Sequence, residues 1–325
     1  MAVNKDNQVE MRDAYGQALL ELGQAYDKML YLDADLHTST KALYFKQRYP
    51  DRFIQVGIAE QNLFGIAAGL AFEGFTPFPS TFAVFASRRA LDQIAISICF
   101  PKLNVKIPGS YVGIPTSRAG GSHNSIEDLA IMRAMPNMKV ADAGSNEDLR
   151  QIMRTAMETP GPVYFRITRY TVPEFFDDHH RFEWGKGEVM HEGSDVTLFG
   201  TGVMTTKCMQ ATELLAKDGI EAEVVHLASI KPIDRALIVQ STQKTGCAVT
   251  AENASILGGF GDAVLEVLAE ENPVPVRKIG VQDAFIESGG IEELFAHYHM
   301  QPNDIAKAAK AVIAKKEKVF AHHKP

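Results

Sequence analysis

Apolar and polar positions along the chain follow two alternating periods, one typical of helices and one typical of strands. In residues 12–30, apolar groups such as Tyr15 and Leu19 recur every three or four positions, which predicts a helix with one buried face. The same spacing predicts a helix over residues 60–72, and the long apolar run at residues 82–99 also favours a helix. Short apolar runs between these helices predict buried strands at residues 30–32, 53–56, 75–79, 105–112, 138–141 and 163–168.

Strands and helices alternate in this way through two stretches, which favours an α/β fold with mostly parallel sheets covered on both faces. Residues 171–190 interrupt the alternation with a polar stretch that holds the only tryptophan. The pattern then restarts, with strands predicted over residues 224–232 and 276–281 and a solvated, lysine-rich helix over residues 306–318. We therefore expect two doubly wound sheets in two domains, at residues 1–170 and 191–325, joined by a linker at residues 171–190.

Composition and charge narrow the range of functions. The 325 residues carry a net charge of −7, and no basic stripe follows any predicted element, which argues against nucleic acid as a partner. No apolar run approaches the roughly 18 residues that a membrane-spanning helix needs. The first six residues hold no apolar signal core, and Cys99, Cys208 and Cys247 lack the spacing of metal ligands. We expect a cytoplasmic protein that binds neither nucleic acid nor membrane, and no metal ligands in this chain.

The segment at residues 57–62 places an acid, Glu60, at the start of a predicted helix and directly after a predicted strand. Open parallel sheets bind ligands at the carboxyl ends of their strands, and a carboxyl group there can exchange a proton with a bound group. A lone acid at a helix N-terminus also has a simpler explanation, since it complements the helix macrodipole. Glu60 is therefore a candidate catalytic residue, with helix stabilisation as its alternative role.

Two phenylalanines and a histidine are candidates for lining a ligand site. Phe82 and Phe85 stand three positions apart at the start of a predicted helix, where their rings would either stack on an aromatic ligand or pack in the core. His123 follows two glycines in a polar loop at the end of a strand. Glycines allow a ligand to approach the backbone closely, although such a histidine is often only a capping or surface residue.

Three arginines fall near the predicted edge of the first sheet. Arg12 opens the first helix, while Arg166 and Arg169 close the last strand of the first half. If these side chains converge, they would hold an anionic group through charge-assisted hydrogen bonds; otherwise they would pair with surface acids. The glycine turn at residues 258–261 does not meet the spacing of a dinucleotide-binding fingerprint.

Together these segments resemble the pyrimidine-binding half of transketolase-like thiamine diphosphate enzymes. The resemblance covers residues 12–170 and continues more faintly through residues 195–300, which resemble the C-terminal domain of the family. It implies a transketolase that transfers a two-carbon glycolaldehyde unit from a ketose to an aldose. Thiamine diphosphate would be the electron sink, and the protein would supply orientation and proton transfer. The segments that carry the resemblance are residues 33–36, 53–62, 80–82, 90–94, 122–138 and 161–166.

The resemblance also implies roles for single residues. Glu60 would hydrogen-bond N1′ of the aminopyrimidine and so promote removal of the C2 proton of the thiazolium. Phe82 would stack on the pyrimidine, and Phe85 would line the same pocket. His123 matches a histidine near the reacting carbon, and Asp35, grouped with the cofactor-binding residues, matches an acid near the subunit junction. The positions where the family holds a substrate phosphate correspond to Arg12, Ser39 and Arg169.

The diphosphate-binding motif of the family is missing from this sequence. In the family, a Gly-Asp-Gly motif with a downstream asparagine binds Mg²⁺, and no Gly-Asp-Gly occurs in these 325 residues. We therefore expect a split enzyme, in which a second polypeptide brings the diphosphate and magnesium site. The cofactor would bind across the junction in an α2β2 assembly, with homodimer contacts through this chain.

The loop at residues 110–119 departs from the family pattern. Tyr111 falls near the position where many transketolases place a histidine for the substrate phosphate, Arg118 adds a cation, and Ala119 replaces an expected acid. We therefore include Tyr111 and Arg118 among the substrate-binding residues. The substrate would be a sugar phosphate or a related anionic sugar, with altered preference for a branched, sulfonated or otherwise unusual sugar.

Three alternatives remain open from the sequence. The first is the β subunit of the thiamine-dependent component of a 2-oxoacid dehydrogenase, which shares this architecture and would decarboxylate a 2-oxoacid. The second is the one-chain deoxyxylulose phosphate synthase type, which the length of the chain disfavours. The third is a non-catalytic chain that only pairs with a full-length enzyme, against which Glu60, Phe82 and His123 argue.

Overall fold

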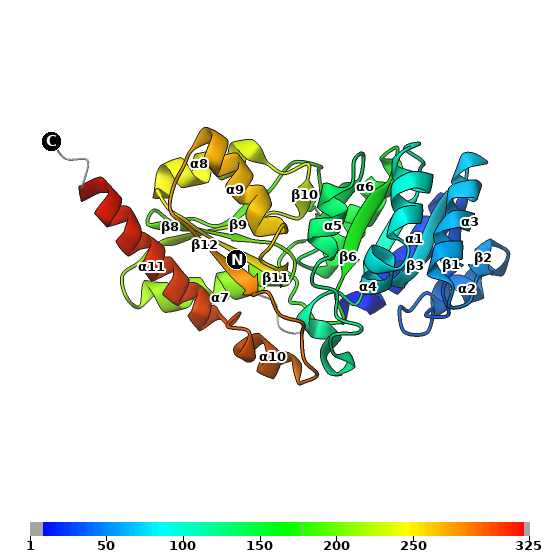
Figure 1. Ribbon diagram of the computed structural model, residues 1–325, viewed down its shortest axis with the longest axis horizontal. Helices are drawn as coiled ribbons and strands as arrows, with labels where there is room; N and C mark the ends of the chain where they lie inside the picture. Colours follow the sequence, from blue (N-terminus) through cyan, green and yellow to red (C-terminus); the bar gives the residue numbers. More distant parts are fainter. Residues whose placement is uncertain (1–8, 178, 322–325) are drawn as a thin grey trace.

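The computed structural model describes residues 9–177 and 179–321, and the chain forms two sheets that lie side by side (Figure 1). Neighbouring strands are parallel except at two edge strands, which confirms the expected class of two mostly parallel sheets. Residues 1–6, which show no signal core in the sequence, lie outside the described residues. The larger sheet contains, in spatial order, β10 (Ser229–Lys231), β5 (Lys139–Asp142), β6 (Val163–Ile167), β4 (Lys106–Ser110), β3 (Thr76–Phe82), β1 (Met29–Asp33) and β2 (Phe53–Gln55). The smaller sheet contains β12 (Val276–Val281), β11 (Ala248–Ser255), β8 (Val196–Gly200), β9 (Ala222–His226) and β7 (Glu188–His191).

Helices cover both faces of each sheet, as a doubly wound arrangement requires. One face of the larger sheet is covered by α1 (Met11–Ala25), α2 (Leu43–Arg48) and α6 (Asn146–Glu158). Its other face is covered by α3 (Glu60–Phe72), α4 (Ala83–Arg88), α5 (Asp128–Ala134) and a π-helix (Gln93–Cys99). The smaller sheet lies between α7 (Met204–Ala216) with α11 (Pro302–Ala321) and α8 (Arg235–Thr245) with α9 (Phe260–Glu271).

Two apolar cores, one on each side of the sheets, hold the two halves together. One core includes Phe165 of the larger sheet and Leu198 of the smaller sheet, and the other includes Tyr164 and Phe199. Adjacent residues of one strand enter opposite cores because successive side chains of a strand point to opposite faces. Full burial of one such side chain stabilises the fold by roughly 1.5–3 kcal/mol. Central strands such as β1 and β6 are therefore apolar at most positions, and these apolar runs predicted them from the sequence.

The predicted single strand over residues 224–232 is wrong, because the chain changes sheets within it. The residues up to His226 form β9 in the smaller sheet. The chain then crosses over, and the backbone N–H of Asp142 donates to the carbonyl oxygen of Ala228 at 2.9 Å. Residues 229–231 form β10, which lies at the edge of the larger sheet and runs antiparallel to β5. The second half of the chain thus supplies a strand to the sheet of the first half.

The predicted long helix over residues 82–99 is interrupted near its start. Phe82 is still the last residue of β3, and α4 ends at Arg88. The chain then re-enters helical structure as a π-helix, in which the N–H of Phe100 donates to the carbonyl oxygen of Ala95 at 2.9 Å. Such i-to-i+5 turns occur mostly as short segments at functional sites. The apolar spacing could not reveal this break, because it continues through both helices.

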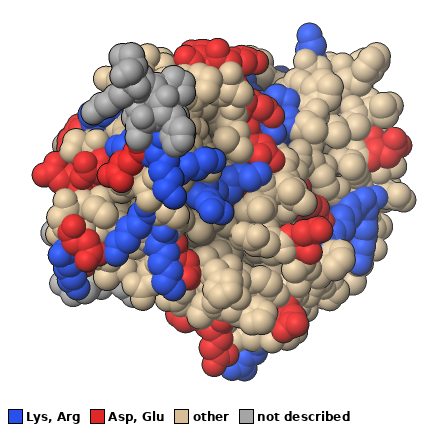
Figure 2. All heavy atoms as spheres, turned by 60° about the vertical axis from the view of Figure 1, so that its left-hand side comes forward, with Lys and Arg blue, Asp and Glu red and all other residues tan. Residues whose placement is uncertain are grey.

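The predicted solvated helix near the C-terminus is wrong in its environment. The helix exists as α11, but Ile305, Ala309 and Val312 are buried against α7 and the smaller sheet. Lys307, Lys310 and Lys315 are exposed, whereas Nζ of Lys316 donates to the carbonyl oxygens of Asp195 and Thr245 at 3.0 Å. Figure 2 shows basic and acidic side chains interspersed on one face of the molecule. Among the residues that the structure describes, no helix is both long enough and apolar enough to cross a membrane.

Candidate active site

Five parallel strands bring most of the predicted site residues to one edge of the larger sheet. In spatial order, β2, β1, β3, β4 and β6 are parallel neighbours, so their carboxyl ends lie together. Sheets of this kind bind ligands at that edge. Each of these strands leads to a predicted site residue. Glu60 follows β2, Asp35 and Ser39 follow β1, Phe82 ends β3, Tyr111 follows β4, and Arg169 follows β6.

Three aromatic rings and an imidazole form the aromatic centre of the site, which we define as Phe82, Phe85, Tyr111 and His123. Phe82 stacks on Tyr111, with ring centroids 4.3 Å apart and an interplanar angle of 25°. Phe85 lies 5.8 Å from Phe82. The His123 ring packs edge-on against both, at 6.1 Å from Phe82 and 5.4 Å from Phe85. The turn from β3 into α4 brings the two phenylalanines together, because Phe82 ends the strand and Phe85 lies in the first turn of the helix.

Tyr111 connects the aromatic centre to two arginines. Its hydroxyl donates to the carbonyl oxygen of Ser39 at 3.1 Å and accepts from Nη1 of Arg12 at 3.1 Å. The guanidinium carbon of Arg169 lies 5.4 Å from the centre of the Tyr111 ring. Burial would lower the pKa of Arg12, but Tyr111 and Glu10 hold it above its ordinary value. The structure thus brings Arg12, Ser39, Tyr111 and Arg169 together, with Ser39 taking part through its main chain.

Glu60 opens α3 and lines a hollow. The side chain is only 6% exposed, and Oε1 accepts from Nη1 of Arg89 at 2.9 Å. Gly57 enables the turn between β2 and the helix, since its φ of +76° favours glycine. The hollow has a volume of about 520 Å³. Its lining residues are Ile58, Ala59, Glu60, Gln61, Asn62 and Arg89.

Arg89 is a site residue that the sequence analysis missed. Its guanidinium pairs with Glu60 and lies over the Phe85 ring, with the guanidinium carbon 4.0 Å from the ring centre. Arg89 therefore connects the acid to the aromatic centre. Its spacing of four residues from Phe85 is a usable signal for the ring contact. The ion pair with Glu60 spans 29 residues and depends on the fold.

Two predicted site residues lie outside this arrangement. Among the contacts of the described residues, neither Asp35 nor Arg118 reaches the aromatic centre, and both side chains are exposed. Asp35 has left-handed backbone with a φ of 63°, and its N–H donates to Oε1 of Gln55 at 3.1 Å. The carboxylate that organises this loop is instead the buried Asp33, which accepts from Nε2 of Gln55 at 2.7 Å and from Nδ1 of His37 at 2.8 Å.

Arg166 does not face a ligand, which corrects the suggestion that it holds an anionic group. Its guanidinium is fully buried and pairs with Asp128 at 2.8 Å and with Asp142 at 2.9 Å. Burial would lower the pKa of Arg166, but the two carboxylates raise it above its ordinary value. Nη2 also donates to the carbonyl oxygen of Asn253, in the second half of the chain, at 3.0 Å. Arg166 therefore belongs to a structural ion-pair cluster between the halves.

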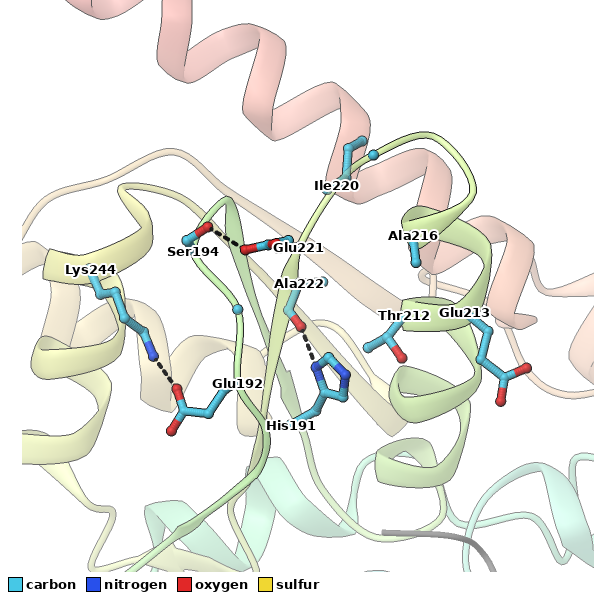
Figure 3. A pocket seen from close by; sticks show the side chains of 12 residues that line it. His191, Glu192, Ser194, Thr212, Glu213, Ala216, Ile220, Glu221, Ala222 and Lys244 are labelled. Carbon is cyan, nitrogen blue, oxygen red and sulfur yellow. Dashed lines mark hydrogen bonds and ion pairs between the residues drawn. The ribbon is translucent and has the colours of Figure 1, made fainter.

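A second hollow, of about 760 Å³, lies in the smaller-sheet half (Figure 3). Its polar side chains engage one another, since Nζ of Lys244 lies 2.7 Å from Glu192 and Oγ of Ser194 lies 3.1 Å from Glu221. The hollow borders the amino ends of β8 and β9. Ligands of such sheets bind at the opposite, carboxyl edge. We therefore assign no ligand to this hollow.

Fold and geometry together define an α/β protein with a candidate ligand site at the carboxyl edge of its larger sheet. The family model of the transketolase pyrimidine-binding domain matches residues 7–174, and that of the transketolase C-terminal domain matches residues 185–305. The chain belongs to the transketolase family. This confirms the resemblance found in the sequence, while the roles of the single site residues stay predictions.

Related proteins include subunits of similar length and longer one-chain enzymes. The 6-deoxy-6-sulfo-D-fructose transketolase subunit SqwH of Clostridium sp. (strain MSTE9) is 41% identical and aligns over 94% of this chain and 95% of its own. One of the apulose-4-phosphate transketolase subunits, from Phocaeicola vulgatus, is 33% identical over 95% of this chain and 99% of its own. The 1-deoxy-D-xylulose-5-phosphate synthase 1 of Geobacter sulfurreducens is 34% identical, and the match covers 93% of this chain but 48% of that enzyme.

A solved structure described as a split gene transketolase, inactive beta4 tetramer, is similar over nearly the whole chain. Its TM-score is 0.89 and its sequence identity is 49%, and the match covers 95% of this chain and 99% of that chain. The arrangement of two sheets is therefore shared with a transketolase chain of the same extent.

Proposed function

We propose that this chain is one subunit of a thiamine diphosphate-dependent transketolase that moves a two-carbon ketol unit from a ketose to an aldose. The observation that best supports the proposal is that Glu60 lines a hollow and is connected through Arg89 to Phe85. A nearly buried carboxyl close to stacked rings suits a flat nitrogen heterocycle such as an aminopyrimidine. The names of two related transketolase subunits are consistent with it.

The residues of this chain fit the pyrimidine end of the cofactor. When bound, thiamine diphosphate supplies an electron sink for cleaving the bond next to a ketose carbonyl. Glu60 would hold the pyrimidine ring through a hydrogen bond from its carboxyl group. Phe82 and Phe85 would fix the ring by stacking. His123, which packs against both phenylalanines, would hold or move a proton at a sugar oxygen.

The arginines beside Tyr111 would bind the anionic end of the sugar. Arg12 contacts the Tyr111 hydroxyl, and Arg169 lies over the Tyr111 ring, so the two cations converge on one side of the aromatic centre. Guanidinium groups form paired, charge-assisted hydrogen bonds with phosphate. Arg118, which is exposed at a distance from this group, would act only if the loop or a partner brings it closer.

A partner subunit would carry the diphosphate and magnesium site. The sequence holds no Gly-Asp-Gly, and within residues 9–177 and 179–321 no group of three His, Cys, Asp or Glu side chains could hold a metal ion. The proposed complex has two copies of each subunit, in an α2β2 arrangement with contacts between the copies of this chain. Asp35, exposed at the same sheet edge, would lie near the junction.

An apolar face beside the hollow is a suitable contact for that partner. α3, the neighbouring π-helix and the residues that flank them expose several large apolar groups, and apolar surface of this kind is suited to contact with another chain. Gly65 and Gly69 lie on the outer side of α3, because a Cβ added to either would meet no atom within 4 Å. Glycines there would allow another chain to approach the helix closely. The exposed apolar residues are Ile58 (74%), Phe72 (79%), Ile96 (60%) and Phe100 (79%).

The free and buried state of the three cysteines supports the expected reducing, cytoplasmic compartment. Cys99, Cys208 and Cys247 are all unpaired and buried. Burial raises the pKa of each thiol, to about 12 for Cys208, which keeps these groups protonated and unreactive. Thiols in that state are typical of reducing compartments.

Transfer assays on the assembled complex test this function. The chain would be co-expressed with a candidate partner that carries Gly-Asp-Gly, and supplied with xylulose 5-phosphate, 6-deoxy-6-sulfo-D-fructose or apulose 4-phosphate as ketol donor. Decarboxylation of a 2-oxoacid is measured in parallel. We expect ketol transfer, with a sugar other than xylulose 5-phosphate preferred. Predominant 2-oxoacid decarboxylation would support the dehydrogenase alternative instead.

The variants Glu60→Ala and Glu60→Gln separate a catalytic chain from a regulatory one. Because positioned acids and bases contribute about 10²–10⁴-fold to rate, either variant should lower kcat by at least about 100-fold. Glu73→Gln, an exposed acid at the other end of the same helix, is the matched control. Unchanged turnover by Glu60→Ala would show that this chain only assists a catalytic partner.

A further inference from the structure

The loop from Tyr111 to His123 connects two residues of the aromatic centre and is unusually constrained. Tyr111 has left-handed backbone with a φ of 63°. A residue other than glycine keeps such a conformation only where its surroundings impose it. Within the larger-sheet half, the Tyr111 N–H donates to the carbonyl oxygen of Ile167 at 2.9 Å, and the Thr116 hydroxyl donates to the carbonyl oxygen of Tyr111 at 2.6 Å. The Gly113 N–H also donates to the carbonyl oxygen of Ser125 at 2.7 Å, so the larger-sheet half holds the loop as far as Gly113 through its backbone.

Asn253 of the smaller-sheet half holds the next part of the loop. It lies in β11 with 2% of its surface exposed, and Oδ1 accepts from the backbone N–H of Ile114 at 2.9 Å. Nδ2 donates to the carbonyl oxygen of Val112 at 3.4 Å. The Asn253 amide thus hydrogen-bonds the loop on both sides of Gly113, which has a φ of +60°. A Cβ at Gly113 would collide with the Asn253 side chain, so the glycine and the amide fit each other.

The far end of the loop rests on the same half of the chain. Oγ of Ser117 donates to the carbonyl oxygen of Gly289 at 2.7 Å. A Cβ at Gly120 would come within 2.6 Å of Oγ of Ser288, so these two segments are in direct contact. The backbone of Asn253 is held in turn by the larger-sheet half, because its carbonyl oxygen accepts from the buried guanidinium of Arg166 at 3.0 Å.

We propose that Asn253 is a positioning residue for sugar binding: it imposes the loop conformation that places Tyr111 and His123 at the aromatic centre. This inference rests on the proposed function and extends it by giving the smaller-sheet half a specific task at the site. Glu60, Phe82 and Phe85 lie on other segments of the chain. Loss of the Asn253 contacts therefore weakens sugar binding and leaves binding of the cofactor ring unchanged.

Hydrogen–deuterium exchange on the full chain tests the contact without any assumption about activity. Asn253→Leu has similar volume but no hydrogen bonds, and should speed exchange of the Ile114 amide by about tenfold, the effect of losing one buried hydrogen bond. Asn253→Asp keeps an acceptor for Ile114 and should retain most of the protection. Glu266→Ala is the control, because it removes another contact between the halves, the ion pair with Arg133. Unchanged exchange in Asn253→Leu would overturn the proposal.

Kinetics of the assembled complex test the consequence for the site. Asn253→Leu should raise KM for the best ketol donor of the panel by about tenfold, for the same loss of one buried hydrogen bond. The apparent constant for thiamine diphosphate should stay within about twofold of wild type, because the Asn253 side chain bonds Ile114 and Val112 while Glu60, Phe82 and Phe85 are held by α3, β3 and α4. Asn253→Asp should recover much of the donor KM. An unchanged donor KM, or a parallel rise of both constants from general destabilisation, contradicts the positioning role. If the wild-type complex transfers no sugar, the proposed function fails, and the exchange comparison alone decides whether Asn253 holds the loop.

Discussion

Nη1 of Arg89 lies 2.9 Å from Oε1 of Glu60, although the two residues come from different helical segments. The same guanidinium covers the Phe85 ring at 4.0 Å, so one side chain ties the candidate proton-transfer group to the aromatic centre. The Arg89 side chain is 53% exposed, whereas that of Glu60 is nearly buried. The arginine therefore approaches the carboxylate from the solvent side of the hollow and orients it.

Replacing Arg89 should affect activity more than stability. A half-exposed ion pair contributes only about 0–1 kcal/mol to folding, so Arg89→Ala should unfold close to wild type. Loss of orientation at Glu60 should still lower kcat about tenfold or more, because small misplacements of reacting groups are costly. Arg89→Lys keeps the charge but not the planar contact with Phe85, and should fall in between. Equal kcat for wild type and Arg89→Ala, measured in the assembled complex, would contradict this role.

Enlarging the outer side of α3 should prevent assembly without unfolding the chain. Gly65 faces open space in this chain, and a larger residue in a helix interior is favoured over glycine by up to about 1 kcal/mol. Gly65→Leu should therefore keep or raise the melting temperature while it abolishes co-purification with the partner. Ala311→Leu, at an exposed position of α11, is the matched control. If Gly65→Leu still forms the complex seen by size-exclusion chromatography, the α3 face is not the contact.

Two arginines at the end of β6 should respond in opposite ways. Arg166→Met leaves Asp128 and Asp142 buried without their cation, and should cost about 3–5 kcal/mol of unfolding free energy in urea titrations. Arg169→Met should leave stability within about 0.5 kcal/mol, as surface changes usually do. It should instead raise the donor KM. A stable Arg166→Met variant with a raised donor KM would restore Arg166 as a ligand residue.

Local periodicity predicted those parts of the fold that depend on local pattern. The helix over residues 60–72 has the predicted bounds because one buried face defines it. The strand β12 also has its predicted bounds, although Arg277 and Lys278 interrupt its apolar residues. β10 could not be predicted, since its three residues form a strand only by pairing with β5 of the other half. The burial of α11 likewise depends on a partner surface that the lysine-rich sequence does not reveal.

Those site residues that follow strand ends were predictable from the sequence. Contacts between residues far apart in the sequence were not. Phe82 ends β3 and Tyr111 follows the neighbouring parallel strand β4, so pairing of these strands brings the two residues to the same edge of the sheet. The pairing of Arg89 with Glu60 depends on how α4 lies against α3, which no spacing encodes. The division into domains at residues 171–190 and the catalytic roles stay predictions.

A histidine in the segment between the sheets should make stability depend on pH. His180 stacks on Phe176 with ring centroids 3.7 Å apart. Its Nε2 faces Asp148 at 3.3 Å and its Nδ1 faces Glu188 at 3.0 Å. Burial would lower the pKa of His180, but hydrogen bonds to the two carboxylates raise it to about 9. His226 faces the other oxygen of Asp148 at 3.0 Å, so this carboxylate joins three segments of the chain.

The sign of the effect follows from the raised pKa of His180. Below its ordinary pKa of about 6.5, the imidazole is protonated in both folded and unfolded chains, and the full stabilisation is present. Between about 6.5 and 9 the unfolded chain loses the proton that the folded chain retains, so the stabilisation shrinks and is gone above about 9. His180→Gln should therefore lower the melting temperature most near pH 6 and little at pH 9.5. Glu188→Gln, which removes one of the two carboxylates, should lower the melting temperature less than His180→Gln does over the same pH range. A gap between wild type and His180→Gln that stays constant from pH 6 to 9.5 would mean that the histidine contributes packing on Phe176 and no charge.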